Sequence, residues 1–129
     1  MKNFIYVDDT FSLIDHRSFI VHIDKIIDED DLLEDLYSKL NFPDYFGFNW
    51  NALSDCLRDF HWMEYHRIII VHDDIPSFND QVLKLYLDVL YSAINDWKEG
   101  EEHELEVVFP KQSKERIESL IASPLVARM

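Results

Sequence analysis

The chain is poor in cysteine, glycine and basic residues, and each of these scarcities excludes certain structures or functions. Its single cysteine, Cys56, cannot form a disulfide within the chain, which is typical of a reducing compartment. Only two of the 129 residues are glycine, so few positions have free access to the left-handed backbone region. No apolar run approaches the roughly 20 residues of a membrane helix, and the N-terminus has no apolar signal core. We therefore expect a cytoplasmic protein that does not bind membranes.

Basic residues are also few relative to acidic ones. Twelve Lys and Arg face 26 Asp and Glu, which gives a formal net charge of −14. A field of this sign repels nucleic acid, attracts basic proteins and accelerates their association. The charge predicts a basic protein partner and no nucleic-acid binding, although a need for solubility explains the same charge equally well.

The composition is that of a folded domain. Hydrophobic residues make up 47% of the chain and aromatic residues 14%, which supports a core and argues against disorder. The sequence contains no repeats and no linker rich in Pro, Gly or Ser. We predict a single domain over residues 1–129.

Short apolar strands alternate with helical patterns along the chain. Strands are expected at residues 4–7, 19–23, 67–72 and 105–109. Helices are expected after Asp28, after Asn49, between Pro76 and Gly100, and at 113–121. This alternation predicts an α/β fold with a parallel sheet.

The segment from Leu40 to Leu57 resembles the signature of the barstar family. It reads LNFPDYFGFNWNALSDCL. The family pattern is a proline, an acid, two aromatics, glycine, any residue and asparagine, followed by a helix with Ala-Leu, aspartate, cysteine and leucine. The match is dense and ungapped. The similar region extends over about residues 18–109, which leaves 1–17 and 110–129 as extensions.

This resemblance implies both a fold and a function. The fold is a small three-stranded parallel sheet packed by helices, to which the extensions would add an N-terminal strand and a C-terminal helix. The function is inhibition of a basic, barnase-type ribonuclease in a one-to-one complex. The protein would then be an intracellular immunity or antitoxin-like protein, would not be an enzyme, and would need no cofactor or metal.

The resemblance also implies where the partner binds. In the family, the second helix and the loop before it block the enzyme's active site. The central aspartate of that helix falls on Asp55, the loop aromatic and glycine on Tyr45 and Gly47, and the loop asparagine on Asn49. A carboxylate on a rigid helix suits a phosphate site, because it accepts charge-assisted hydrogen bonds from basic side chains.

Three further positions of the expected contact surface depart from the family pattern. Asn51 stands where an aspartate is frequent, Ser54 where an aromatic is frequent, and Phe60 where a tryptophan is usual. Asn51 keeps hydrogen-bonding capacity without the charge, and Ser54 offers less area to bury. These departures leave open a different basic partner, including a toxin that is not a ribonuclease.

The remaining residues of the motif are expected in the core. We expect Phe46 to pack inward and Tyr45 to face outward. The inner stripe of the second helix would be Trp50, Leu53 and Leu57. Cys56 is interpreted as a small buried hydrophobe and not as a nucleophile.

The residues taken alone are also compatible with two different functions. Histidines and acids between His61 and Asp74 leave open a metal-dependent hydrolase, although their spacing fits no common zinc pattern. A broad acidic mimic of nucleic acid would bind its partner in a salt-sensitive way but would be indifferent to Asp55.

Overall fold

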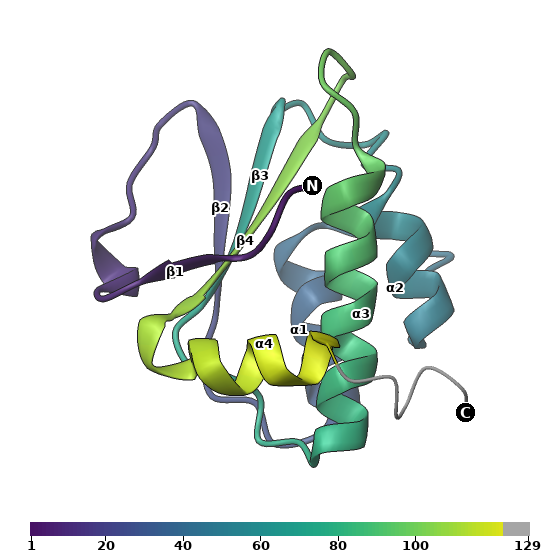
Figure 1. Ribbon diagram of the computed structural model, residues 1–129. Helices are drawn as coiled ribbons and strands as arrows, with labels where there is room; N and C mark the ends of the chain where they lie inside the picture. The colour runs from purple at the N-terminus through teal and green to yellow at the C-terminus, as the bar shows by residue number, and fades with distance from the viewer. Residues whose placement is uncertain (123–129) are drawn as a thin grey trace.

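One parallel sheet organises the part of the chain that the structure describes. The computed structural model describes residues 1–122, and its strands are β1 (Ile5–Val7), β2 (Ser18–Ile23), β3 (Arg67–His72) and β4 (Glu104–Pro110). The helices of this part are α1 (Glu29–Lys39), α2 (Trp50–Leu57), α3 (Asp80–Asp96) and α4 (Lys114–Ala122), with short 3-10 helices η1 (Thr10–Ser12) and η2 (Lys111–Ser113). The strand order is β1-β4-β3-β2, and every neighbouring pair is parallel (Figure 1). The predicted α/β fold is confirmed.

The predicted N-terminal strand is the fourth strand of this sheet. β1 pairs with β4, placing Ile5 opposite Val108 and Tyr6 opposite Phe109. The Phe4 ring meets the Phe109 ring edge-on at 5.2 Å between centroids. The predicted C-terminal helix is α4, and residues 123–129 of the predicted extension lie outside the described residues.

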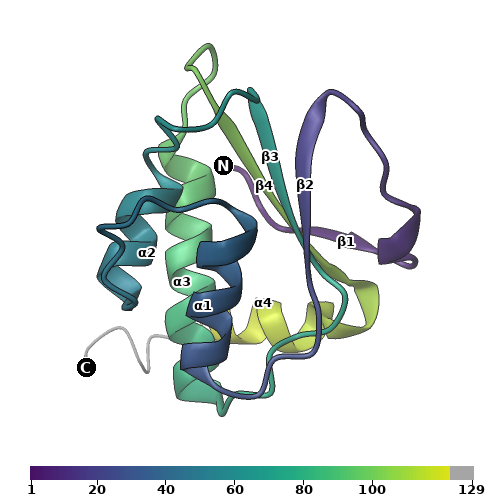
Figure 2. The same cartoon turned by 180° about the vertical axis from the view of Figure 1, so that it is seen from behind.

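Helices α1, α2 and α3 gather on the same side of the sheet, as the two opposite views show (Figures 1 and 2). The main core fills the space between them and the sheet, where Ile68 and Ile70 of β3 are completely buried. A smaller cluster on the opposite face contains Ile69 and Val71 with Val108 of β4. β3 is therefore apolar on both faces, which explains its unbroken run of aliphatic residues.

Side-chain caps set the helix starts that the sequence predicted. Asp28 Oδ1 accepts a hydrogen bond from Asp31 N at 2.9 Å at the start of α1. Asn49 Oδ1 accepts one from Ala52 N at 2.8 Å at the start of α2. α1 ends at Lys39, four residues before Pro43, because Asn41 adopts a left-handed conformation with φ of 55°.

Candidate functional site

The loop before α2 is held by its own side chains. Asn49 caps α2 with its oxygen, while its Nδ2 donates to the Gly47 carbonyl at 3.2 Å. A Cβ on Gly47 would lie 3.2 Å from that same Nδ2, so glycine lets the loop and the capping amide approach closely. The side chain of Asn49 thus orders the loop, and the absence of a side chain at Gly47 leaves room for the Asn49 amide. Both residues are exposed.

The two neighbouring aromatics of the loop point in opposite directions, as predicted. Phe46 is only 4% exposed, and its ring packs against Phe42 at 4.8 Å and Tyr37 at 6.0 Å between centroids. Tyr45 is 70% exposed. Phe46 therefore anchors the loop in the core, while Tyr45 presents its ring to solvent.

Helix α2 presents a polar face outward. Leu53 and Leu57 are completely buried, which confirms their prediction as core residues, and Trp50 is half-buried. On the outer side Asn51 and Asp55 are exposed and Ser54 is half-buried. The outer face of α2 and the exposed part of its preceding loop form one continuous surface, which we call the α2 surface.

The Asp55 carboxylate is a largely exposed charged group of the α2 surface. Its side chain is 80% exposed, and its contact is an ion pair with Arg58 Nη2 at 3.7 Å. An exposed pair of this kind contributes little to stability. The carboxylate is therefore held on a helix but is free to accept hydrogen bonds from another molecule.

Cys56 lies on the inner side of α2 and is buried, as predicted. Burial first, and then the carboxylates of Asp59 and Asp55, raise the pKa of its thiol to about 11. The thiol is consequently protonated near neutral pH, and only a thiolate would be a good nucleophile.

Phe60, which the resemblance placed on the contact surface, is buried in the free protein. Phe60 follows α2 in a left-handed conformation with φ of 51°, and its side chain is 0% exposed. Its ring packs among Trp62, Trp97 and His103, with centroids 5.7 to 6.3 Å away. The Phe60 ring therefore packs in the core next to α2 and is not part of the α2 surface of the free protein.

His72 belongs to the core and not to a metal centre. It is completely buried; its Nδ1 bonds the Val108 carbonyl at 3.1 Å, and its Nε2 bonds Tyr86 Oη at 2.6 Å. Both ring nitrogens are thus occupied within the protein. Among residues 1–122, no three His, Cys, Asp or Glu side chains are grouped so that they could hold a metal ion.

The burial of His72 predicts acid sensitivity. Desolvation lowers the pKa of His72 to about 4, outweighing the Val108 carbonyl and the Asp73 carboxylate, which raise it. The unfolded chain binds a proton near pH 6.5 and the folded one does not, so stability is lost as the pH falls from 6.5 to 4. We expect the free energy of unfolding to drop by about 2 kcal/mol from this group between pH 7 and pH 5.

Urea unfolding at several pH values measures this effect. The His72→Asn variant is the control, because it keeps a side-chain donor for Val108 but cannot take up the proton. It should be less stable at pH 7 and should lose less stability than the native chain on acidification. Parallel pH profiles for the two proteins would exclude His72 as the source.

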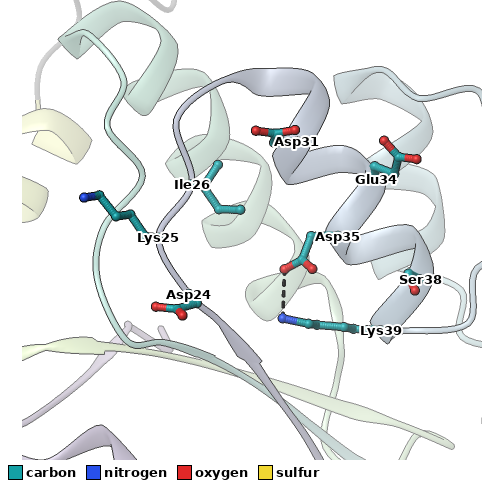
Figure 3. A pocket seen from close by; sticks show the side chains of 8 residues that line it. All are labelled: Asp24, Lys25, Ile26, Asp31, Glu34, Asp35, Ser38 and Lys39. Carbon is teal, nitrogen blue, oxygen red and sulfur yellow. Dashed lines mark ion pairs between the residues drawn. The ribbon is translucent and has the colours of Figure 1, made fainter.

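Acidic side chains also gather beside α1. Figure 3 shows a hollow between α1 and the segment that joins β2 to it. Its lining contains four carboxylates, namely those of Asp24, Asp31, Glu34 and Asp35. Asp35 pairs with Lys39 at 3.0 Å, and Lys25 points away from α1. This hollow adds to the negative field on the helical side of the sheet.

Two exposed residues near the α2 surface are not among the expected contact residues, although the helical pattern placed Asp59 on the outer face of the second helix. Phe48 is 45% exposed in a left-handed conformation with φ of 51°, although the motif allows any residue there. Asp59 lies just beyond α2, and its side chain is 44% exposed. The signal for Asp59 was its spacing, four residues after Asp55, which places i and i+4 side chains on neighbouring turns.

The fold and the α2 surface define a barstar-type α/β protein. A family model described as "Barstar (barnase inhibitor)" matches residues 16–110, which include β2, β3, β4, α1, α2 and α3. The chain is also 31% identical over 77 residues to the "Putative ribonuclease inhibitor YrdF" of Bacillus subtilis (strain 168), covering 60% of this chain and 80% of that relative. The chain belongs to the barstar family, a family of ribonuclease inhibitors.

β1, η1 and α4 lie outside the matched residues. Over residues 1–122, no helix combines the length and the apolar character needed to cross a membrane.

Proposed function

We propose that this protein binds a basic, barnase-type ribonuclease one to one and blocks its active site with the α2 surface. It would act as an immunity protein in the cytoplasm of a cell exposed to that enzyme. Membership in a family of ribonuclease inhibitors supports the proposal. The observation that carries it is the exposed Asp55 carboxylate, held on α2 beside the exposed loop that carries Tyr45.

The rigidity of this surface suits inhibition. The Asn49 cap and the buried Phe46 ring order the loop before any partner arrives. A preorganised surface loses less conformational entropy on binding, and this increases affinity. Asp55 would enter the site where an RNA phosphate binds, accepting charge-assisted hydrogen bonds from its basic side chains. Tyr45 would add a large contact area at low entropic cost.

The negative field supports a basic partner. The net charge is −14, and the acidic hollow of Figure 3 lies on the side of the sheet that also bears α2. Complementary charge accelerates encounter, and salt screens it. Association with the ribonuclease is therefore expected to slow as the salt concentration rises.

Titration into a panel of small basic ribonucleases tests the proposed function. We expect inhibition of at least one enzyme to be complete at one equivalent of the protein, measured by cleavage of a fluorogenic RNA. Because the affinity is expected to be high, activity should fall linearly with added protein. If every enzyme, barnase included, stays fully active with a tenfold excess of the folded protein, inhibition of barnase-type ribonucleases is excluded.

A different basic partner is the second candidate. Asn51 is exposed without a charge, and Ser54 is small and only half-buried, so the α2 surface differs from the family pattern at two positions. A toxin that is not a ribonuclease would fit the same fold and charge. Specific binding of such a toxin that is lost on changing Asp55, together with unaltered ribonuclease activity, would favour this candidate.

A further inference from the structure

The Arg58 side chain folds back over the last turn of α2. Arg58 is the C-terminal cap residue of this helix, and both its backbone N and its Nε donate to the Ser54 carbonyl, at 3.2 and 3.3 Å. Its Nη2 then lies 3.7 Å from Asp55 Oδ1, close enough for an ion pair but too far for a hydrogen bond. The guanidinium is thus held to the helix backbone beside the carboxylate at the centre of the proposed site.

The helix cap uses only part of the guanidinium group. Arginine has five N–H donors in a planar fork. Among residues 1–122 the Nε donor makes the one hydrogen bond of this side chain, which is 42% exposed. A positive charge is favourable near a helix C-terminus, and this explains a cation here but not the unused Nη donors beside Asp55. Arg58 therefore brings spare donors to the α2 surface next to the Asp55 acceptor.

Any partner that binds Asp55 must also face Arg58, because the two charged groups are 3.7 Å apart. A ribonuclease phosphate site that consisted only of cations would attract Asp55 and repel Arg58. Moving Arg58 away into solvent would break its side-chain hydrogen bond to Ser54. An enzyme with an anionic acceptor next to those cations would instead pair with both groups, and matched charges of this kind determine which partner an interface accepts.

The chemistry of RNA cleavage supplies such an acceptor. An enzyme that directs the ribose 2′-hydroxyl at the phosphate needs a general base beside the phosphate site to take the hydroxyl proton. A glutamate or aspartate in that role is negatively charged and accepts two parallel hydrogen bonds from a guanidinium. A neutral histidine in that role has no negative charge and accepts only one. The charge of the general base is thus a property that Arg58 distinguishes.

We propose that the Asp55–Arg58 pair selects a ribonuclease whose general base is a carboxylate. Asp55 pairs with the cations of the phosphate site, and Arg58 pairs with the general-base carboxylate beside them. The pair therefore engages two catalytic groups of opposite charge in the enzyme. This inference rests on the proposed function and specifies the class of ribonuclease that the α2 surface accepts.

Arg58→Gln tests this inference with the ribonuclease that the native protein inhibits. Glutamine removes the charge and the fork, so we expect the inhibition constant to rise at least about 10-fold, through faster dissociation. Arg116→Gln on α4 is the matched control, because Arg116 is also 42% exposed and also pairs with a carboxylate, that of Asp80 at 2.9 Å. Each variant is more negative by one charge, which favours association with a basic enzyme. The control should therefore inhibit at least as well as the native protein.

A variant of the enzyme separates pairing from a structural role of Arg58. Replacing the general-base carboxylate of the enzyme with the matching amide leaves Arg58 without an anion to pair with. Because this enzyme is inactive, calorimetry measures its binding. We expect Arg58→Gln and the native protein to bind it with affinities within about threefold of each other. An equal loss of affinity for both forms of the enzyme would overturn the inference, since the helix cap would then explain the effect.

Two other results would contradict the pairing and leave the proposed function in place. One is inhibition by Arg58→Gln that is as tight as that of the native protein or tighter, because Arg58 would then be neutral or repulsive in the complex. The other is inhibition only of ribonucleases whose general base is a histidine. Absence of inhibition by the native protein would remove the proposed function and this inference with it.

Discussion

Replacing Asp55 with asparagine is expected to weaken inhibition of the ribonuclease at least 100-fold without destabilising the protein. In the proposed complex the carboxylate is buried against basic side chains, and removing one partner of a buried charge pair costs about 3–5 kcal/mol, since the other charge is left unpaired. In the free protein the same carboxylate is exposed and has only a loose contact with Arg58. The loss of that contact should be negligible for folding.

The measurement compares inhibition constants and urea unfolding curves for the native and Asp55→Asn proteins. Glu115→Gln is the control, because Glu115 is exposed on α4, outside the residues that match the family, and the substitution removes one negative charge, as Asp55→Asn does. It should inhibit almost as well as the native protein. Full inhibition by Asp55→Asn would show that the enzyme is blocked by another surface, and the proposed function would then stand without this site.

The features that the sequence predicted well are those that depend on neighbouring residues. The cap of α2 is formed by Asn49 and the backbone amide three residues later, so a short stretch of sequence is enough to predict it. The aliphatic run of β3 is likewise enough to predict a strand that is buried on both faces of the sheet. The opposite directions of Tyr45 and Phe46 follow from adjacent positions in one loop. The resemblance to the barstar family then predicted how these local elements are arranged in one fold.

The features that the sequence could not predict depend on contacts between distant residues. His72 looked like one member of a group of histidines and acids, but its neutral, buried state depends on Tyr86 in α3 and Val108 in β4. The local pattern gave no indication that either group would be within hydrogen-bonding distance.

Phe60 shows most clearly that a resemblance in sequence does not fix where a side chain points. It lies three residues beyond Leu57, the last residue of α2, and the resemblance to the barstar family placed it on the contact surface. Phe60 adopts a left-handed conformation, and its buried ring packs against Trp97, just after α3, and His103, just before β4. The resemblance matches the type of residue at this position and does not reveal the backbone conformation that goes with the buried ring.

Truncating Phe60 to alanine is therefore expected to lower the free energy of unfolding by about 3–5 kcal/mol, a large part of the stability of a small domain. The ring is completely buried, so its loss removes transfer free energy and leaves a cavity beneath α2. Urea unfolding measures the change. Because alanine at this position could unfold the protein, Phe60→Leu provides a milder variant, with an expected loss of about 1–2 kcal/mol.

The same variants separate a core role from a contact role. If Phe60 only supports the α2 surface, folded Phe60→Leu protein should inhibit the ribonuclease with an affinity within about threefold of the native value, while its unfolding midpoint falls. A contact role predicts the opposite combination: an unchanged midpoint and a markedly higher inhibition constant. That combination would require the ring to leave the core on binding, and it would return Phe60 to the partner-binding surface.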